Sequence, residues 1–127
     1  MHEFAVAQSL VDTATVEARR AGAQRVTVIH CRIGVLRQVN SDLLNEAFSL
    51  ARQGTLCEAA ELRVDKAYVQ ASCGRCDHAY TVRDWEWRCP KCGAEAAELT
   101  GGDELLLVSI EADVADEDQG SEERLST

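Results

Sequence analysis

The sequence predicts an α+β fold in which a small metal-binding lobe is inserted before the last strand. Three observations support this prediction. Two segments have the apolar periodicity of amphipathic helices, three segments are predicted to be strands, and two Cys-x-x-Cys motifs lie close together. With 127 residues, 46% of them hydrophobic, the chain is expected to form one domain, at most with a small satellite.

The first predicted helix covers residues 4 to about 21. Arg19 and Arg20 lie in its last turn, and Gly22 suits the position just after a helix end. Its apolar residues recur every three or four positions, as expected of a helix with one buried face. The residues expected to face inward are Phe4, Ala7, Val11, Ala14, Ala18 and Ala21, with Val6 and Leu10 beside them.

A strand and a second helix are predicted next. Residues 25–33 alternate polar with apolar side chains and are rich in β-branched residues, so we expect a strand that ends at Gly34. The following helix is expected to stop near Gly54. Its candidate N-caps are Asn40, Ser41 and Asp42. Its expected inward residues are Leu43, Leu44, Ala47, Phe48 and Ala51.

Two further strands are predicted at residues 61–72 and 104–114, with a cysteine-rich insert at 73–93 between them. If the two flanking strands pair with each other, the insert forms a lobe on the sheet. Residues 115–127 have almost no apolar content and are expected to form a disordered acidic tail.

The charge of the chain is acidic and unevenly distributed. The net charge is −9, but only 15 acidic and 12 basic residues precede Glu111. A chain without a basic stripe is a poor nucleic-acid binder. No apolar run approaches the roughly 20 residues of a membrane span, and the start lacks the pattern of a signal peptide. We therefore expect a cytoplasmic protein whose six cysteines stay reduced.

The two Cys-x-x-Cys motifs predict a zinc site. Twelve residues separate Cys73 and Cys76 from Cys89 and Cys92, which is zinc-ribbon spacing. Each motif turns tightly enough to aim two sulfurs at one point, so the four thiolates form the tetrahedron of a closed structural zinc site. Two alternatives are a redox dithiol in one motif and a single iron bound by the four sulfurs.

A closed site of this kind has no coordination position for catalysis, so its expected role is to fold the lobe. Zinc binding of about 10–16 kcal/mol can supply folding energy that a short insert lacks. Trp85 and Trp87 are expected to pack the lobe, with a partner-binding aromatic pair as the alternative. His78 is either an exposed residue or a replacement ligand, and Cys31 and Cys57 are expected to be buried small hydrophobes.

The first three residues, Met1, His2 and Glu3, form a candidate chelate. The α-amine of Met1, the deprotonated amide of His2 and the His2 imidazole Nδ1 close a five-membered and a six-membered ring around one metal ion. Glu3 can complete the set with an oxygen or its amide nitrogen. Planar, nitrogen-rich sites suit Ni(II) and Cu(II). The alternative is a solvated terminus leading into a helix.

These features together resemble the HypA/HybF family of nickel metallochaperones that act in [NiFe]-hydrogenase maturation. The resemblance rests on the starting MHE, the helix after it, the strand ending at Ile33 and Gly34, the helix around LNEAFSLA, and CGRC and CPKC. It extends to about Val114. It implies a nickel-binding domain of two helices on a three-stranded sheet, formed by residues 1–70 and 100–114, and a zinc ribbon at 71–99.

The resemblance also implies partners and ligands. The partners are a HypB-type GTPase and the [NiFe]-hydrogenase large subunit, which receives the nickel; a homodimer stays open. The nickel ligands would be Met1, His2 and Glu3, and the zinc ligands would be the four cysteines of the two motifs. Some members place an aspartate near the start of the second helix, where this chain has Asn40 and, two residues on, Asp42.

The alternative function is a zinc-ribbon interaction module that delivers no nickel. An enzyme is not expected, because the sequence contains no nucleophile with an evident base, no phosphate-binding loop and no HExxH motif. The identity of the nickel acceptor and any metal contact by Asn40, Asp42 or His78 stay open.

Overall fold

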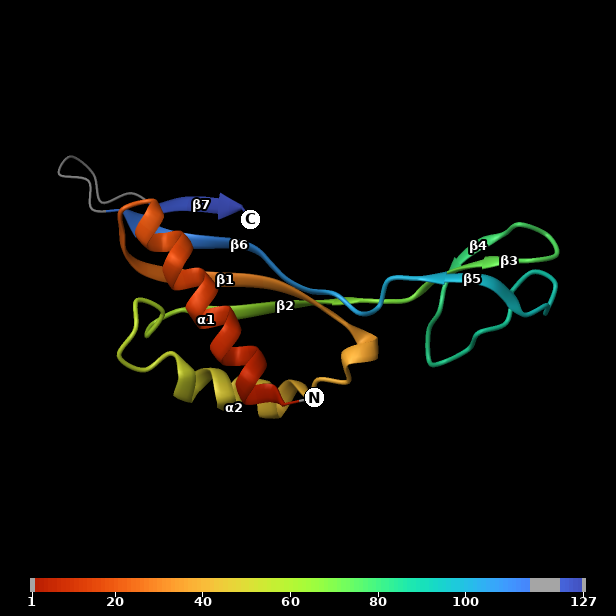
Figure 1. Ribbon diagram of the computed structural model, residues 1–127, viewed down its shortest axis with the longest axis horizontal. Helices are drawn as coiled ribbons and strands as arrows, with labels where there is room; N and C mark the ends of the chain where they lie inside the picture. The colour runs from red at the N-terminus through yellow and green to blue at the C-terminus, as the bar shows by residue number, and fades with distance from the viewer. Residues whose placement is uncertain (1, 115–121, 127) are drawn as a thin grey trace. The chain divides into compact units, whose positions relative to one another are not determined.

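The computed structural model describes residues 2–114 and 122–126 (Figure 1). None of the described helices is long and apolar enough to cross a membrane. The elements in chain order are α1 (Glu3–Arg20), β1 (Ala23–Gly34), the 3-10 turn η1 (Val35–Arg37), α2 (Ser41–Ala51), β2 (Glu61–Ala67), β3 (Gln70–Cys73), β4 (Ala79–Thr81), β5 (Ala96–Thr100), β6 (Leu105–Val114) and β7 (Glu122–Ser126).

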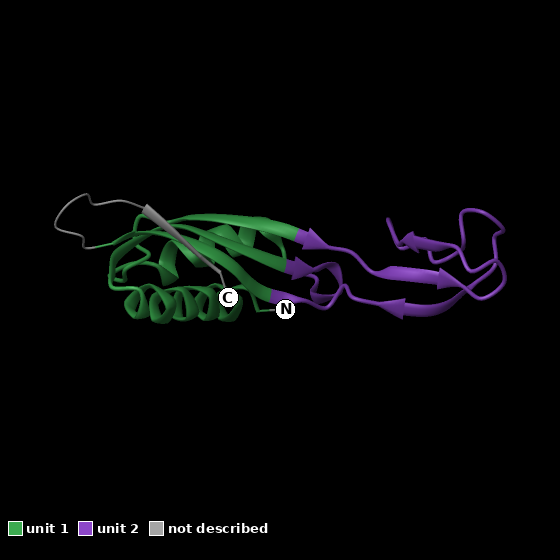
Figure 2. Ribbon diagram, turned by 90° about the horizontal axis from the view of Figure 1, so that it is seen from above, with its two compact units in different colours: residues 1–32, 39–65, 106–127 green, residues 33–38, 66–105 purple. Residues whose placement is uncertain are grey.

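The chain divides into two compact units (Figure 2). Unit 1 comprises residues 1–32, 39–65 and 106–127, and unit 2 comprises residues 33–38 and 66–105. Unit 1 contains both helices and most of a four-stranded sheet with the strand order β2-β1-β6-β7. Unit 2 contains a three-stranded sheet with the order β4-β3-β5 and both cysteine motifs. The predicted fold class, helices with a sheet and a four-cysteine lobe, is confirmed.

Helix α1 begins one residue earlier than predicted, and its buried face follows the predicted spacing. The chain reverses direction just after the helix. Gly22 has a φ of +73° there, a left-handed conformation that glycine adopts without strain. Phe4 is an exception to the prediction, because 51% of it is exposed. The buried residues of α1 are Val6, Ala7, Leu10, Val11, Ala14 and Ala18.

Helix α2 packs against α1 and is capped by a side chain. The side-chain oxygen Oδ1 of Asn40 accepts a hydrogen bond from the backbone N–H of Leu43 at 3.0 Å, which satisfies a donor that the helix leaves free. Leu43, expected to face inward, is 51% exposed. The buried residues of α2 are Leu44, Ala47, Phe48 and Ala51.

The central strands of the larger sheet are β1 and β6. Arg25 on β1 forms an ion pair with Asp113 on β6, and the hydroxyl of Thr27 donates to the carbonyl oxygen of Glu111 at 3.1 Å. Because residue numbers rise along β1 as they fall along β6, the two strands are antiparallel. The sequence expectation that the strands flanking the insert pair with each other is wrong. Strand β1, which is apolar on both faces, lies between β2 and β6.

The acidic tail differs from the sequence expectation where it is described. Residues 115–121 and 127, part of the predicted disordered tail, lie outside the described residues. Glu122–Ser126 form β7, which pairs antiparallel with β6 in the register Ile110↔Leu125. Pairing of this kind needs only the backbone groups at the edge of β6, so a composition-based prediction does not detect it.

One strand of the sequence prediction corresponds to two strands in the structure. Residues 61–72 were expected to form a single strand, but β2 and β3 belong to different sheets. Strand β3 pairs antiparallel with both β4 and β5. The small core of this unit consists of Val69, Ala71 and Val82, against which Val35, Tyr80, Trp87 and Ala96 pack.

The two tryptophans of unit 2 have different environments. Trp87 packs against the core as expected, and its carbonyl oxygen accepts a hydrogen bond from the hydroxyl of Tyr80 at 2.6 Å. Trp85 does not fit the packing prediction, because 53% of it is exposed. The segment is not extended, since Asp84 and Trp85 are the central residues of a turn that the N–H of Glu86 closes on the carbonyl oxygen of Arg83.

Gly34 lies where two backbone segments of unit 2 approach each other. Its N–H donates to the carbonyl oxygen of Glu104 at 2.7 Å, and the N–H of Leu36 donates to that of Gly102 at 2.7 Å. A Cβ atom at Gly34 would collide with the Gly102 carbonyl and with the N–H of Asp103. Only glycine permits this approach.

We expect Gly34→Ala to lower the free energy of unfolding by about 3 kcal/mol, at the upper end of the cost of overpacking, because backbone atoms cannot rotate aside. Chemical denaturation of the metal-loaded protein measures the loss. Gly54→Ala is the control, since its φ of +72° is strained for alanine but nothing lies within 4 Å. It should cost about 1 kcal/mol. Equal losses in the two variants would contradict the crowding at Gly34.

Candidate metal sites

The two cysteine motifs of unit 2 are built by the same hydrogen bonds. The N–H of Cys73 donates to the carbonyl oxygen of His78, and the N–H of Cys89 donates to that of Ala94, both at 2.9 Å. In each motif the carbonyl oxygen of the first cysteine accepts an N–H from four residues on, at 3.2 Å for Asp77 and 2.9 Å for Gly93. These bonds turn the chain tightly, so that both sulfurs of a motif point to one side.

The four sulfurs converge. All the Sγ atoms lie within 4.8 Å of one another, with 3.4 Å between Cys73 and Cys92 and 3.7 Å between Cys76 and Cys89. A zinc–sulfur bond of about 2.3 Å in a tetrahedron implies sulfur–sulfur edges of about 3.8 Å. Cys73 and Cys89 are buried, whereas Cys76 and Cys92 are exposed. The four-cysteine group therefore fits a structural zinc site.

Backbone N–H groups also donate to the first sulfur of each motif. The Sγ of Cys73 accepts hydrogen bonds from the N–H groups of Arg75 at 3.3 Å and Cys76 at 3.4 Å, and the Sγ of Cys89 accepts one from Lys91 at 3.4 Å. The bonds from Cys76 and Arg75 lower the pKa of the Cys73 thiol to about 6. Because the thiolate is the metal-binding form, Cys73 is prepared for a metal at neutral pH.

Four other residues with potential ligand atoms have other roles. His78 is outside the four-sulfur group, and its ring stacks on Tyr80 with 6.2 Å between ring centroids. The side-chain oxygen of Asn40 is used as the cap of α2. Cys31 and Cys57 are fully buried in unit 1, as expected, and burial raises the pKa of the Cys31 thiol to about 12. A protonated, buried thiol is chemically inert.

His2 and Glu3 lie at the start of α1, and Met1 lies outside the described residues. His2 occupies the N-cap position, yet its side chain makes no capping hydrogen bond and is exposed. Residues that usually cap a helix, such as serine or aspartate, would accept an N–H here. The imidazole of His2 is thus left free of structural hydrogen bonds within the described chain.

Glu3 connects the starts of the two helices, which lie side by side in Figure 1. Its Oε2 accepts a hydrogen bond from the backbone N–H of Asn40 at 2.9 Å. This bond, with one from the N–H of Glu3 itself, lowers the pKa of the Glu3 carboxyl. Glu3 is therefore a fixed negative charge beside His2, at the positive ends of two helix dipoles.

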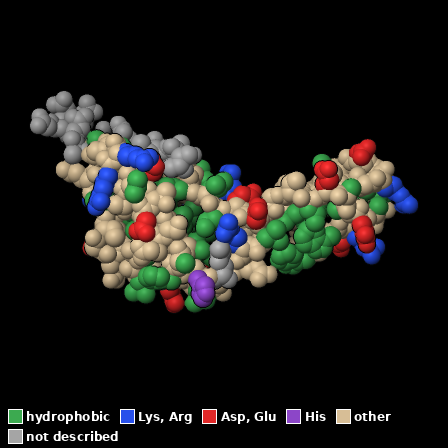
Figure 3. All heavy atoms as spheres, in the orientation of Figure 1, with side chains coloured by type: hydrophobic (Ala, Val, Ile, Leu, Met, Phe, Trp, Pro, Cys, Tyr) green, Lys and Arg blue, Asp and Glu red, His purple; other side chains and the backbone are tan. Residues whose placement is uncertain are grey.

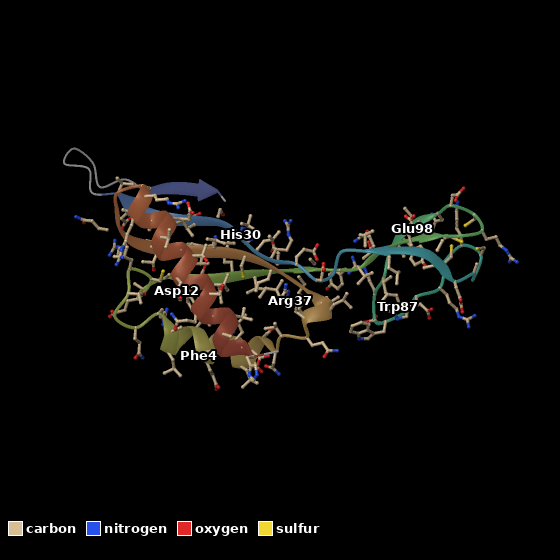
Figure 4. All side chains as sticks on the ribbon, in the orientation of Figure 1. Phe4, Asp12, His30, Arg37, Trp87 and Glu98 are labelled. Atoms are coloured by element: carbon tan, nitrogen blue, oxygen red, sulfur yellow. The ribbon has the colours of Figure 1, made fainter. Side chains whose placement is uncertain are left out.

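A shallow hollow adjoins His2 and Glu3, and apolar side chains dominate it (Figure 4 labels Phe4). One acidic residue of this hollow, Glu46, is not among the predicted site residues; it lies one helical turn after Asp42. The sequence signal for this residue is its spacing from Asp42: residues four positions apart on a helix lie on the same side of it. Among the described residues, only the four cysteines bring three or more potential metal ligands together.

Comparison with known proteins gives consistent matches over most of the chain. Residues 1–112 match the family model described as HypA: hydrogenase/urease nickel incorporation, metallochaperone. The chain is 39% identical over 112 residues to the hydrogenase maturation factor HypA of Roseiflexus sp. (strain RS-1), covering 87% of this chain and 91% of that protein. It is 36% identical over 110 residues to the protein of the same name from Chlorobium luteolum, covering 87% and 94%.

Solved structures agree with these matches. The structure is similar to the solution structure of the nickel metallochaperone HypA from Helicobacter pylori, with a TM-score of 0.62 and 27% identity. The similarity covers 91% of this chain and 100% of that one.

We expect Cys89→Ser to abolish stoichiometric zinc binding. Four thiolates together bind a structural zinc ion with a free energy of about 10–16 kcal/mol, and a closed site that loses one of them loses most of that free energy. Native mass spectrometry counts the metal, and amide hydrogen exchange should accelerate over residues 66–105. Cys57→Ala, in unit 1, is the matched control and should retain one zinc ion. A Cys89→Ser protein that still holds one zinc ion would contradict the four-sulfur site.

Proposed function

The chain belongs to the HypA family of nickel metallochaperones in hydrogenase maturation, and on that premise we propose that it binds one Ni(II) ion at its N-terminus and delivers it to the [NiFe]-hydrogenase large subunit. We propose that Cys73, Cys76, Cys89 and Cys92 hold zinc for structure alone. The observation that carries the nickel proposal is the state of His2: a helix N-cap that is exposed and makes no capping bond.

The proposed nickel ligands are the α-amine of Met1, the amide nitrogen and imidazole of His2, and a group from Glu3. Nitrogen-rich planar sites favour Ni(II) over the harder divalent ions. A cation at a helix N-terminus is disfavoured by the helix dipole, so a compensating negative charge is needed. The ionised carboxylate of Glu3, fixed by its bond to Asn40, supplies that charge, and deprotonation of the His2 amide supplies another.

Delivery needs a site that the acceptor can reach. His2 is exposed, and the hollow beside it contains three apolar side chains that are each at least half exposed, namely Phe4, Leu43 and Leu50. We propose that the acceptor docks near this hollow and displaces the ligands stepwise. The proposed setting is the cytoplasm, with a HypB-type GTPase as the second partner.

No catalytic role is proposed. A zinc ion bound by four thiolates has no open position for substrate or water. The acidic charge of the chain does not favour nucleic acid. The alternative, a zinc-ribbon interaction module that carries no nickel, predicts no stoichiometric nickel site and is tested by the same titration.

Nickel binding by the zinc-loaded, untagged protein should be lost in His2→Ala and after addition of one residue before Met1, because the first removes the imidazole and the second converts the amine to an amide. Native mass spectrometry should count one nickel ion in the unchanged protein and none in these variants. His30→Ala, which removes a histidine from β1, is the matched control and should keep the nickel. Undiminished nickel uptake by His2→Ala would refute the ligand set.

Nickel affinity should fall by roughly tenfold or more between about pH 8 and about pH 6, because protons compete for the amine, amide and imidazole nitrogens. Glu3 should not contribute to this change. A carboxyl whose pKa lies below its ordinary value of 4.5 stays ionised above that value, and its bond to Asn40 is lost only as the pH falls through the lowered pKa. Calorimetric titration at several pH values measures the trend. A flat affinity would contradict nitrogen ligation.

A further inference from the structure

Trp85 occupies a turn that disfavours its side chain. The N–H of Glu86 donates to the carbonyl oxygen of Arg83 at 3.0 Å, and the two central residues, Asp84 and Trp85, have φ values of +52° and +61°. Turns with two left-handed residues strongly prefer Asn-Gly, because a side chain at such a φ is strained. Backbone strain of this kind concentrates where a side chain must be presented for a function.

The indole of Trp85 is more than half exposed, although it borders a second hollow whose lining includes the core residues Val69 and Val82. Trp85 is 53% exposed, whereas the neighbouring Trp87 packs against the core. The rings lie 6.0 Å apart, and together with Ala96 and Leu99 they form the apolar part of a hollow of about 320 Å³. Leu99 is 50% exposed. Figure 3 shows hydrophobic side chains gathered on this part of unit 2.

Strand β5 forms one edge of this hollow and one edge of its sheet. It pairs with β3 and is the last strand in the order β4-β3-β5, and every residue of β5 after Ala96 is exposed. Native edge strands are commonly protected by proline, lysine or burial. The sequence of β5, Ala-Ala-Glu-Leu-Thr, has neither proline nor a basic residue. The backbone just before β5 is already used, because Glu95 forms an antiparallel bridge with Arg88. The outer backbone groups of residues 97–100 are therefore the template for another strand.

A bulge sets which side chains of β5 share a face. Glu98 is paired with Ser72 and Ala96 with Cys73, so Ala97 is an extra residue. The extra residue brings Ala96 and Leu99 to the face that carries the hollow. Glu98 alternates with Leu99 and so lies on the opposite face. Figure 4 labels Glu98 on β5 and Trp87 in the loop beside it.

The charges around β5 are mainly acidic. Glu86 and Glu95 line the hollow with one base, Arg88, and Glu98 makes no ion pair within the described part of the chain. A strand added to β5 therefore meets an apolar face and an acidic face. An added strand in which apolar and basic side chains alternate complements both faces, because its apolar side chains lie on one face and its basic side chains on the other.

We propose that the outer edge of β5 and the exposed indole of Trp85 form a docking surface for an extended segment of a partner protein. The segment adds a strand to the sheet, with apolar side chains against Trp85 and Leu99 and basic side chains on the side of Glu98. This mode of recognition draws affinity from main-chain hydrogen bonds and specificity from alternate side chains. The surface is additional to the proposed nickel function and uses none of its ligands.

A second copy of this chain is a poor occupant of the same edge. Antiparallel pairing of two β5 strands centred on Glu98 would place this carboxylate of one copy against that of the other. Like charges directly opposite each other destabilise a strand pair. The edge is thus directed at a different, basic sequence.

The test uses the full-length, zinc-loaded, nickel-free protein and a capped six-residue peptide that alternates lysine with valine. The expected result is saturable binding with NMR shifts confined to residues 85–88 and 95–100. A peptide that alternates glutamate with valine should not bind. Absence of saturable binding, or equal binding of the two peptides, would overturn the proposal.

Two variants separate docking from folding. Trp85→Gly relieves the strain of the turn, so the lobe should stay folded with one zinc ion while the dissociation constant for the lysine peptide rises at least tenfold. Glu98→Lys should exchange the preference between the two peptides. Leu106→Ala, at an equally exposed leucine on β6, is the matched control and should change nothing.

Two outcomes of these variants would count against the surface. Unchanged affinity in Trp85→Gly would exclude the indole, and self-association through β5 in the absence of peptide would replace the partner with a second copy. Nickel stoichiometry should be unaffected in every variant. Failure of the docking surface is therefore distinguishable from failure of the proposed nickel function.

Discussion

Convergence of four sulfurs is the interaction on which unit 2 depends. Apart from the cysteines, the buried residues of its core cluster are Val69, Ala71 and Val82. So small a core does not stabilise a lobe of this length without a further link. The two cysteine motifs supply that link by repeating one hydrogen-bond pattern, and N–H groups directed at the sulfurs favour the thiolate form. The position of β5 and the presentation of Trp85 both follow from this arrangement.

The two proposed metal sites have opposite requirements, which the chain meets with different chemistry. A structural ion is best held by four thiolates, because they leave no coordination position open for ligand exchange. In this chain two of the four cysteines are also buried. A transported ion needs ligands that an acceptor can reach and remove. The start of α1 offers an exposed imidazole at an uncapped helix end and a carboxylate held in place by the first turn of α2. Stable binding and release are thus assigned to separate units.

Local patterns in the sequence predict much of this fold and only part of its sites. The periodicity of both helices, the cap at Asn40 and the convergence of the cysteines follow from spacing and residue type. The break between β2 and β3 cannot be predicted in this way. The strand-like sequence continues through Tyr68 and Val69, while the chain passes from one sheet to the other. The turn at Asp84 and Trp85 contains no glycine or asparagine to signal it. The bond between Glu3 and Asn40 joins residues 37 positions apart, which no local pattern reveals.

In the proposed function, two different metals occupy two chemically distinct ligand sets in one chain. X-ray absorption at the nickel and zinc edges of the untagged protein, loaded with one equivalent of each metal, tests it most directly. The zinc spectrum should show four sulfur neighbours at about 2.3 Å, and the nickel spectrum should show nitrogen and oxygen neighbours with no sulfur. Sulfur in the nickel shell, or fewer than four sulfurs around zinc, would contradict the account.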